Sequence, residues 1–312
     1  MTETNYWPDI VGQPIAKRKL EFHLENYTAS SILPHLLFIA PKGCGKTMMA
    51  KATGKNLKQS GIPKAFIELN CSTLRSVGQF INQVIIPHVN QRDCTVLFDE
   101  ASELPKDVSM ALLTILNPNR DNRTSFSYED YTIDFDFRRQ SFMFATTEAH
   151  KLFHALIDRC DRIDLEEYSF DELGEILQRN LPDTIFDKGL KKEIATVLRG
   201  NARAAQKMSN NIKSLLKRKS SDKMTNEVWA ELSRALGILP LGLNRIEIQV
   251  LNYLTEKKEC SLTNLAAKTG LTAQCLRMDF ELYLQKHNLM EIKTSGRSIT
   301  TKGLEYLKDL KK

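Results

Sequence analysis

The first half of the chain alternates short apolar runs with stretches in which apolar residues recur at helical spacing. The runs are rich in β-branched and aromatic residues, as buried parallel strands are. They are "HLLFIA" (35–40), "AFIEL" (65–69), "TVLFDE" (95–100) and "SFMFATT" (141–147). Helices are expected between them, in "KTMMAKATGKNLKQSG", which ends at Gly61, and in "PKDVSMALLTILN", where the helix starts after Pro105. This alternation predicts a parallel α/β sheet with a ligand site at the carboxyl ends of its strands.

The second half shows two different patterns. From Asp171 to about Leu239 the apolar residues keep helical spacing, which predicts an all-α domain. Gly and Pro then interrupt the chain in "GILPLGLN" (237–244). Residues 244–312 predict a winged helix, with three helices followed by two short strands around a "TSGR" turn. The fold class is therefore an α/β P-loop domain (1–168), an all-α lid (169–240) and a C-terminal winged-helix domain (241–312).

Composition agrees with a globular protein. The hydrophobic fraction is 42% and the charged fraction 26%, and neither a membrane span nor a secretory signal is recognisable in the sequence. The six cysteines lack a C-x-x-C pair, which argues against a zinc site and a disulfide framework. The expected compartment is the cytoplasm.

Charge is distributed unevenly along the chain. The formal net charge is +6, and residues 199–220 hold seven Lys or Arg and no Asp or Glu. This segment indicates either a polyanion partner or a solvated helix face, and charge alone does not choose between them.

Residues 40–47, "APKGCGKT", follow the phosphate-loop pattern G-x-x-x-x-G-K-[ST], with Ala40 in place of the first glycine. Gly43 and Gly45 permit backbone conformations in which successive N–H groups face phosphate oxygens. Lys46 is expected to reach the β- and γ-phosphates, and the Thr47 hydroxyl to ligate Mg²⁺. Because the pattern follows a strand and begins a helix, it predicts a site for ATP and Mg²⁺. The flanking residues expected in the same site are Pro41, Cys44 and Met48.

Two strand ends supply further candidates. In "TVLFDE", Asp99 is expected to hold the metal and Glu100 to orient the attacking water. In "SFMFATT", the hydroxyls of Thr146 and Thr147 are expected to sense the γ-phosphate, although threonines at a strand end are also common structural residues.

The order of these features resembles the AAA+ ATPase family, and within it the RuvB family of bacterial Holliday-junction branch-migration motors. The similarity extends along nearly the whole chain. "DIVGQ" is similar to the element beside the adenine, "FATTEAH" to the sensor 1 strand, and "LIDRC" to the segment with the arginine finger. "LEEY" and "GNAR" are similar to the segments that precede and begin the lid's sensor 2 region.

The resemblance implies roles for individual residues. Arg159 would be the finger that completes the ATP site of a neighbouring subunit, so the catalytic set is Lys46, Glu100 and Arg159. Arg203 would contact the γ-phosphate within its own chain. The adenine pocket would be lined by Ile10, Val11 and Tyr168. The implied assembly is a homo-oligomer, a hexameric ring around duplex or four-way-junction DNA.

Two segments indicate possible partners: the wing for DNA, and residues 117–140 for a junction-binding protein. Arg297, in the "TSGR" turn, is the expected DNA contact, with a solvated turn residue as the alternative. Residues 117–140 differ from the family's hairpin, which grips the junction-binding protein RuvA. A RuvA-like partner is therefore an implication of the resemblance that this segment leaves open.

The sequence predicts an ATP-dependent DNA motor, a helicase of DNA recombination and repair that migrates Holliday junctions. One alternative is a clamp loader or helicase loader. Another, from a different class, is a DNA-binding regulator that binds ATP without motor activity. Glu100 favours turnover over the regulator, since binding alone needs no water-orienting carboxylate.

Overall fold

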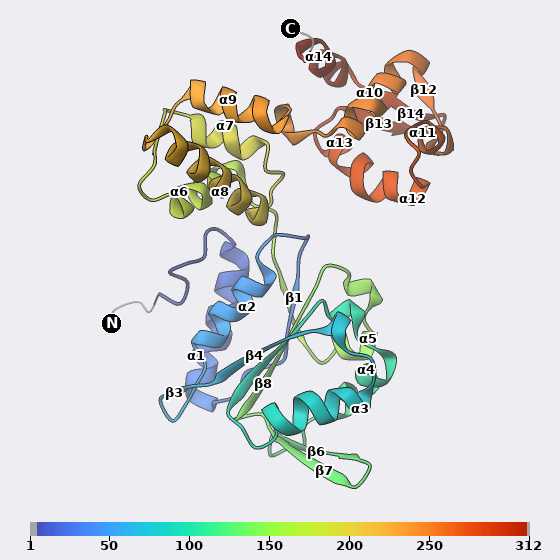
Figure 1. Cartoon of the computed structure of the whole chain (residues 1–312). Helices are drawn as coiled ribbons and strands as arrows, with labels where there is room; N and C mark the ends of the chain where they lie inside the picture. The colour runs from blue at the N-terminus through green and yellow to red at the C-terminus, as the bar shows by residue number, and fades with distance from the viewer. Residues whose placement is uncertain (1–4, 311–312) are drawn as a thin grey trace. The chain divides into compact units, whose positions relative to one another are not determined.

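The computed structural model describes residues 5–310, and the chain divides into two compact units, Met1–Asp222 and Lys223–Lys312 (Figure 1). The α/β sheet and every residue expected in the nucleotide site belong to the first unit. The expected winged helix belongs to the second. The finer division into three domains, at residues 168 and 240, stays a prediction.

A five-stranded parallel sheet forms the centre of the first unit, in the order β4-β5-β8-β1-β9. Four of its strands confirm the positions of the predicted apolar runs to within one residue at each end, but the expected burial is wrong for β4, an edge strand with no buried residue. The fifth, β9, was not predicted, because only Ile163 in it is buried and charged residues surround it. The strands are β1 (Leu36–Ile39), β4 (Ala65–Asn70), β5 (Cys94–Asp99), β8 (Gln140–Thr146) and β9 (Asp161–Asp164).

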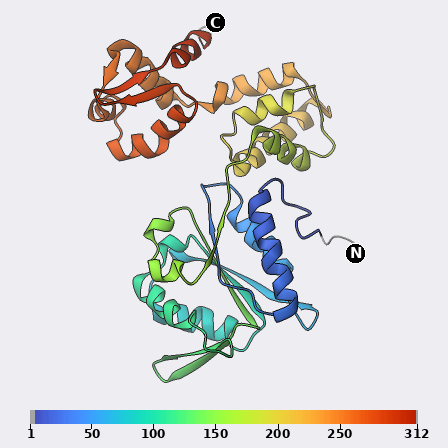
Figure 2. The same cartoon turned by 180° about the vertical axis from the view of Figure 1, so that it is seen from behind.

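Helices cover both faces of this sheet. Figures 1 and 2 show α1 and α2 on one face, and α3, α4 and α5 on the other. Alternate strand residues therefore enter two separate cores, such as Phe38 and Leu97 in one, and Phe98 and Phe144 in the other. The helices are α1 (Pro14–Ser30), α2 (Lys46–Lys55), α3 (Val77–Phe80), continued by a π-helix (Ile81–Val89), α4 (Lys106–Ile115) and α5 (His154–Ile157). Short 3-10 turns occupy Cys71–Thr73, Ala101–Glu103 and Ala149–Lys151.

The expected helix from Lys46 to Gly61 is too long. It ends at Lys55, and the chain then forms a small hairpin of β2 (Lys58–Gln59) and β3 (Ile62–Pro63). Ser60 and Gly61, between these strands, both have positive φ angles, of 50° and 80°. Two consecutive positive φ angles form a tight hairpin turn and are incompatible with a right-handed helix.

Residues 117–140 contain the hairpin that their alternating pattern predicts, made of β6 (Arg123–Tyr128) and β7 (Tyr131–Asp136). Ile133 and Phe135 are buried in the core, whereas Tyr131 is exposed. On the outer face Ser125 Oγ donates to Asp134 Oδ1 at 2.5 Å. The aromatic residues of this segment thus divide between core and surface, and its outer face is polar.

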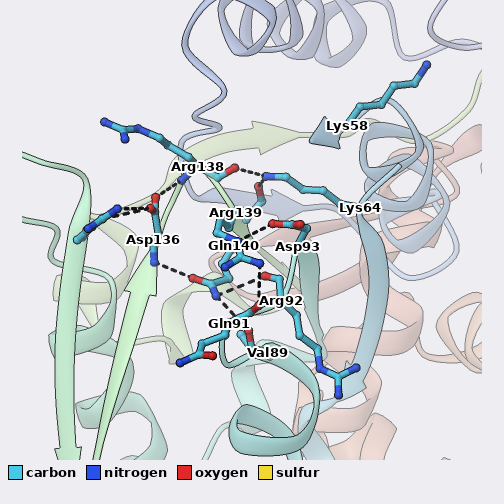
Figure 3. A network of polar contacts seen from close by, with 12 residues as sticks. Lys58, Lys64, Val89, Gln91, Arg92, Asp93, Asp136, Arg138, Arg139 and Gln140 are labelled. Atoms are coloured by element: carbon cyan, nitrogen blue, oxygen red, sulfur yellow. Dashed lines mark hydrogen bonds and ion pairs between the residues drawn. The ribbon is translucent and has the colours of Figure 1, made fainter. Parts of the chain in front are cut away.

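A closed hydrogen-bond network occupies the amino-terminal ends of β5 and β8 (Figure 3). Gln140 is buried, and its Nε2 donates to Val89 O at 3.0 Å while its Oε1 accepts from Asp136 N at 2.8 Å. Arg139 Nε donates to Asp93 Oδ1 at 2.7 Å. These bonds attach the root of the β6–β7 hairpin firmly to the central sheet.

Lys64, which precedes β4, belongs to the same edge (Figure 3). Its ammonium donates to Arg138 O at 2.8 Å and to Ser141 Oγ at 3.3 Å, and lies 5.1 Å from the centre of the Tyr27 ring. Burial lowers the pKa of Lys64 to about 8. We call Lys64, Asp93, Arg139 and Gln140 the amino edge of the sheet.

The rest of the first unit is mainly helical. Ser169 and Glu172 form a capping box that starts α6. Asn201 caps α8, accepting hydrogen bonds from Arg203 N and Ala204 N. The elements are α6 (Phe170–Asn180), β10 (Ile185–Phe186), α7 (Leu190–Thr196) and α8 (Ala202–Lys219).

The second unit contains the predicted winged helix, preceded by α9. Ser261 and Thr272 cap its second and third helices as their side chains suggest, and Gly270 ends the second in the left-handed region. The third helix is continuous from Ala273 to Lys286, with a π segment in its middle. The sheet order is β12-β14-β13, and neither β12 nor α14 was predicted. The elements are β11 (Lys223–Met224), α9 (Asn226–Leu236), a 3-10 turn (Pro240–Gly242), α10 (Arg245–Lys257), β12 (Glu259–Cys260), α11 (Leu262–Thr269), α12 (Ala273–Cys275), the π segment (Leu276–Glu281), α13 (Leu282–Lys286), β13 (Met290–Lys293), β14 (Gly296–Ile299) and α14 (Thr301–Asp309).

Candidate nucleotide site

A cavity of about 370 Å³ lies at the carboxyl ends of β5 and β8, between the phosphate loop, α6 and the start of α8. Its volume is in the range of small-molecule sites. Twelve predicted residues line it: Ile10, Val11, Gly43, Gly45, Lys46, Thr47, Met48, Asp99, Glu100, Thr147, Tyr168 and Arg203. We call this end of the sheet, with these residues, the carboxyl edge.

The phosphate loop has the expected backbone. Gly43 and Gly45 have φ angles of 85° and 91°, which side chains rarely adopt. Lys46 follows at the start of α2, and its ammonium donates to Ala40 O at 3.0 Å and to Pro41 O at 3.3 Å. Burial lowers the pKa of Lys46, while the nearby Glu100 carboxylate acts in the opposite direction. The loop therefore holds a buried cation against its own carbonyl oxygens.

Three loop residues lie outside the cavity lining. Cys44 is buried among the residues that pack between α1, α2 and the sheet, so its side chain serves the core. Ala40 is also buried and does not have a positive φ, which explains why alanine can replace glycine there. Pro41 contributes the carbonyl oxygen that Lys46 contacts.

Thr47 and Asp99 meet in the cavity. Thr47 Oγ1 donates to Asp99 Oδ2 at 2.9 Å, and Asp99 Oδ1 accepts from Glu100 N at 3.0 Å. Glu100 has a φ angle of 54° and an exposed side chain that lines the cavity. A hydroxyl and a carboxylate in contact are oxygen ligands of the kind that Mg²⁺ prefers, so these residues fit the metal.

Thr146 and Thr147 take different positions. Thr147 lines the cavity as predicted. Thr146 does not: its side chain is fully buried, and its hydroxyl accepts from Glu148 N at 3.0 Å. Thr146 is the last residue of β8 and is buried, whereas Thr147 follows the strand, so only the second of the two lines the cavity.

On the side expected for adenine, Ile10 and Val11 are buried and line the cavity, together with Tyr168. Burial raises the pKa of the Tyr168 hydroxyl. Gln13 fixes this region, because its Nε2 donates to Glu166 O at 2.7 Å and its Oε1 accepts from Glu166 N at 3.0 Å. This two-way amide clamp joins the "DIVGQ" and "LEEY" segments, a role that no sequence pattern indicated.

The start of α8 is joined directly to the phosphate loop. Arg203 lines the cavity, Asn201 Nδ2 donates to Lys42 O at 3.1 Å, and Ala202 N donates to Gly43 O at 3.0 Å. A side chain at position 43 would collide with Asn201. Further lining residues that sequence reasoning missed are Asp9, Lys42, Ile176, Arg179, Asn180, Ala202 and Gln206.

Arg159 does not line the cavity of its own chain. It follows α5, and its Nη1 donates to Ala155 O at 2.7 Å. Its Nε is buried without a hydrogen-bond partner among residues 5–310. The predicted role as a finger for another subunit stays a prediction.

Arg297 is not in the turn of the wing. It lies within β14, opposite Ile292, and its guanidinium donates to both carboxylate oxygens of Glu281 at 2.8 and 3.2 Å. The side chains are 15% and 3% exposed. The expected position was wrong because β14 begins at Gly296, and the DNA contact predicted for Arg297 stays a prediction.

Two family models match the chain. Residues 36–168 match the ATPase family associated with various cellular activities (AAA), and residues 240–308 match the RuvB C-terminal winged helix domain. The chain carries an AAA ATPase domain and a RuvB-type winged helix. The AAA domain contains the whole of β1, β4, β5 and β8 and therefore the centre of the candidate site.

Several curated relatives of this chain bear the name Holliday junction branch migration complex subunit RuvB. The relative from Wolbachia of Brugia malayi is 26% identical over 286 residues, which cover 90% of this chain and 85% of the relative. That from Ehrlichia canis is 27% identical and covers 98% and 92%. A solved structure, the Thermotoga maritima RuvB Holliday junction branch migration motor, superposes with a TM-score of 0.75 at 24% identity, over 96% of this chain and 95% of that one. This last similarity supports the fold.

Among residues 5–310 no helix is both long and apolar enough to cross a membrane.

Proposed function

We propose that this chain is an ATP-hydrolysing DNA motor of the RuvB type, which assembles as a ring on duplex DNA and migrates Holliday junctions. The observation that carries the proposal is the convergence of Lys46, the Thr47–Asp99 pair, Glu100 and Arg203 on one cavity of an AAA domain. The presence of a RuvB-type winged helix and the names of the relatives support the action on junction DNA.

The residues of the cavity divide the chemistry of phosphoryl transfer among them. Lys46 and the amides of the phosphate loop would bind the β- and γ-phosphates of ATP. Thr47 and Asp99 would hold Mg²⁺, which when bound neutralises charge on the phosphates. Glu100 would orient the attacking water by accepting a hydrogen bond from it. Arg203 would contact the terminal phosphate from α8.

The cavity of one chain lacks the arginine that the family resemblance assigns to the finger, because Arg159 lies elsewhere. A second copy supplying Arg159 would complete the site, and the ring follows from repeating that contact. We propose a hexamer, as the resemblance implies. A RuvA-like partner at the β6–β7 hairpin belongs to the same proposal, although the polar outer face of this hairpin calls for a polar contact surface on that partner.

The loader alternative is weakened by the winged helix that follows residue 240, since the loader reading expects a helical collar there. The regulator alternative predicts that ATP binds without rapid turnover. The loader and the regulator can both be distinguished from the motor by testing which kind of DNA, if any, stimulates ATP hydrolysis.

The decisive experiment measures migration of a synthetic four-way junction by the full chain with ATP and Mg²⁺, with and without a RuvA protein. The motor is expected to convert the junction to duplex products and to hydrolyse ATP faster on duplex DNA. Glu100→Gln serves as the turnover-deficient control. Stimulation only by primer-template DNA with a sliding clamp would favour the loader, and ATP binding without DNA-stimulated hydrolysis would favour the regulator.

A further inference from the structure

Helix α8 carries six cations, four of which lie on one side of the helix. Arg203, Lys207, Lys213 and Lys217 fall within about 120° of its circumference at 3.6 residues per turn. The opposite side carries the buried residues Ala205, Met208, Ser209, Ile212, Leu215 and Leu216. These four cations of the acid-free segment share one face of α8, which we call the cation stripe (Arg203, Lys207, Lys213, Lys217), while Arg218 and Lys219 lie outside it in the last turn.

The cation stripe is exposed and unpaired. All four side chains are exposed, and none of them takes part in an ion pair or side-chain hydrogen bond with any other residue in 5–310. Lysines of the preceding helix behave differently, since Lys192 Nζ lies 3.0 Å from Asp171 Oδ1 and Lys191 bonds to Gln178. The stripe thus keeps its full charge for an external partner.

The spacing within the stripe is unfavourable for an isolated helix. Arg203 and Lys207 are four residues apart, as are Lys213 and Lys217, and like charges at this spacing destabilise a helix by about 0.2–0.5 kcal/mol per pair. No acidic residue in α8 offsets the repulsion. A polyanion laid along the helix would remove it.

The length of the stripe suits a nucleic-acid backbone. Fourteen residues of helix separate Arg203 from Lys217, which at 1.5 Å per residue is about 20 Å. Duplex DNA carries one phosphate charge per about 1.7 Å of axis, so about twelve phosphates occupy that length. We propose that the three lysines of the cation stripe, Lys207, Lys213 and Lys217, bind the phosphate backbone of duplex DNA, as a contact separate from the winged helix, while Arg203 faces the nucleotide cavity. This inference rests on the proposed action on duplex DNA.

Because the cation stripe begins beside the nucleotide cavity, DNA bound to α8 would affect the ATP site. Its first member, Arg203, lines the nucleotide cavity, and the cap residue Asn201 bonds to Lys42 in the phosphate loop. DNA held along α8 would therefore restrain the helix that presents Arg203 to the nucleotide.

The test is a titration of a fluorescent duplex with the full chain, without ATP, over a series of salt concentrations. The triple variant Lys207→Gln, Lys213→Gln, Lys217→Gln leaves Arg203 in place and keeps good helix formers. Each phosphate contact contributes about 0.9 to the slope of log affinity against log salt, so the magnitude of the slope should fall by about 2.7. The matched control Lys58→Gln, Lys106→Gln, Lys188→Gln removes the same charge from exposed lysines elsewhere in the unit and should leave the slope unchanged.

Two outcomes would overturn this inference and leave the proposed function intact. One is a triple variant whose slope and affinity match the unmodified chain, or fall only as far as those of the control. The other is loss of self-association in the triple variant, measured by sedimentation without DNA, while its DNA slope is unchanged, since the stripe would then be a protein interface. Thermal unfolding and DNA-free ATP hydrolysis of the triple variant should equal those of the unmodified chain. If the unmodified chain itself binds no duplex at low salt, the proposed function fails as well.

Discussion

The two edges of the central sheet both carry buried or half-buried polar residues, but they satisfy them differently. At the amino edge, the Gln140 amide bonds to three backbone groups and the Lys64 ammonium to two oxygens, within a closed network. At the carboxyl edge, the hydrogen bonds of the Lys46 ammonium within residues 5–310 all go to carbonyl oxygens of its own loop, and Glu100 lines a cavity. The polar groups of the amino edge form hydrogen bonds with one another, so this edge is structural. At the carboxyl edge, polar groups beside a cavity have hydrogen-bonding capacity that the described residues do not use, so this edge is suitable for a ligand.

The strongest test of this contrast asks whether the nucleotide site at the carboxyl edge needs Arg159 from a second chain for ATP hydrolysis. We expect Arg159→Ala to reduce DNA-stimulated ATP hydrolysis about 1,000-fold, because a finger arginine stabilises transition-state charge. Mixing Arg159→Ala with Lys46→Ala chains should partly restore activity, since some interfaces would regain both groups. Arg162→Ala, which removes an exposed ion pair with Asp164, is the matched control. No recovery on mixing would place the finger elsewhere.

Next in size is the loss of the water-orienting carboxylate. Glu100→Gln keeps the shape of the side chain and removes its basicity, so kcat should fall about 100-fold while ATP affinity is retained. Glu103→Gln changes an exposed carboxylate outside the cavity lining and should have no such effect. Steady-state hydrolysis and equilibrium nucleotide binding measure the two quantities. Equal activities of the two variants would remove Glu100 from the mechanism.

At the amino edge the same kind of change should affect stability instead of activity. Gln140→Met leaves Asp136 N and Val89 O without their partner and should lower the free energy of unfolding by about 2 kcal/mol. ATP affinity should be unchanged. Chemical denaturation measures the effect, with the exposed Gln83→Met as control. A selective loss of ATP affinity would contradict a purely structural edge.

The smallest expected effect depends on pH. His35, just before β1, is buried against Phe137 and Phe142, and burial lowers its pKa from 6.5 to about 4. The folded state therefore holds the neutral ring, while the unfolded chain takes up a proton below pH 6.5. Stability should fall as the pH decreases, by about 1.5 kcal/mol between pH 7.5 and 5.5. His35→Phe should lack this component, as denaturation at both pH values would show. An unchanged pH dependence in the variant would exclude His35 as its source.

Several parts of the fold followed from local signals. Apolar runs of five to seven residues identified β1, β4, β5 and β8. Continuous hydrophobicity is typical of strands that are buried on both faces, as β1, β5 and β8 largely are, whereas β4 lies at the edge of the sheet and has no buried residue. The helical spacing of residues 244–286 also identified the three helices of the winged helix, which begin at caps such as Thr272. The strand β9 was missed because it contains only one apolar residue, Ile163. The end of α2 was placed too late, because the chain leaves the helix at Lys55 to form the β2–β3 hairpin, whose turn at Ser60 and Gly61 is set by backbone conformation.

The sequence by itself determined the chemistry of the nucleotide residues, because the glycines, Lys46, Thr47, Asp99 and Glu100 stand directly at strand ends or a helix start, where parallel strands bring them to one edge. Only the tertiary structure decided which of two threonines faces the cavity and that Gln13 and Asn201 join distant segments. It also decided that Arg297 forms an ion pair with Glu281. Those outcomes depend on side-chain direction and on contacts between residues far apart in the chain. A linear motif contains neither.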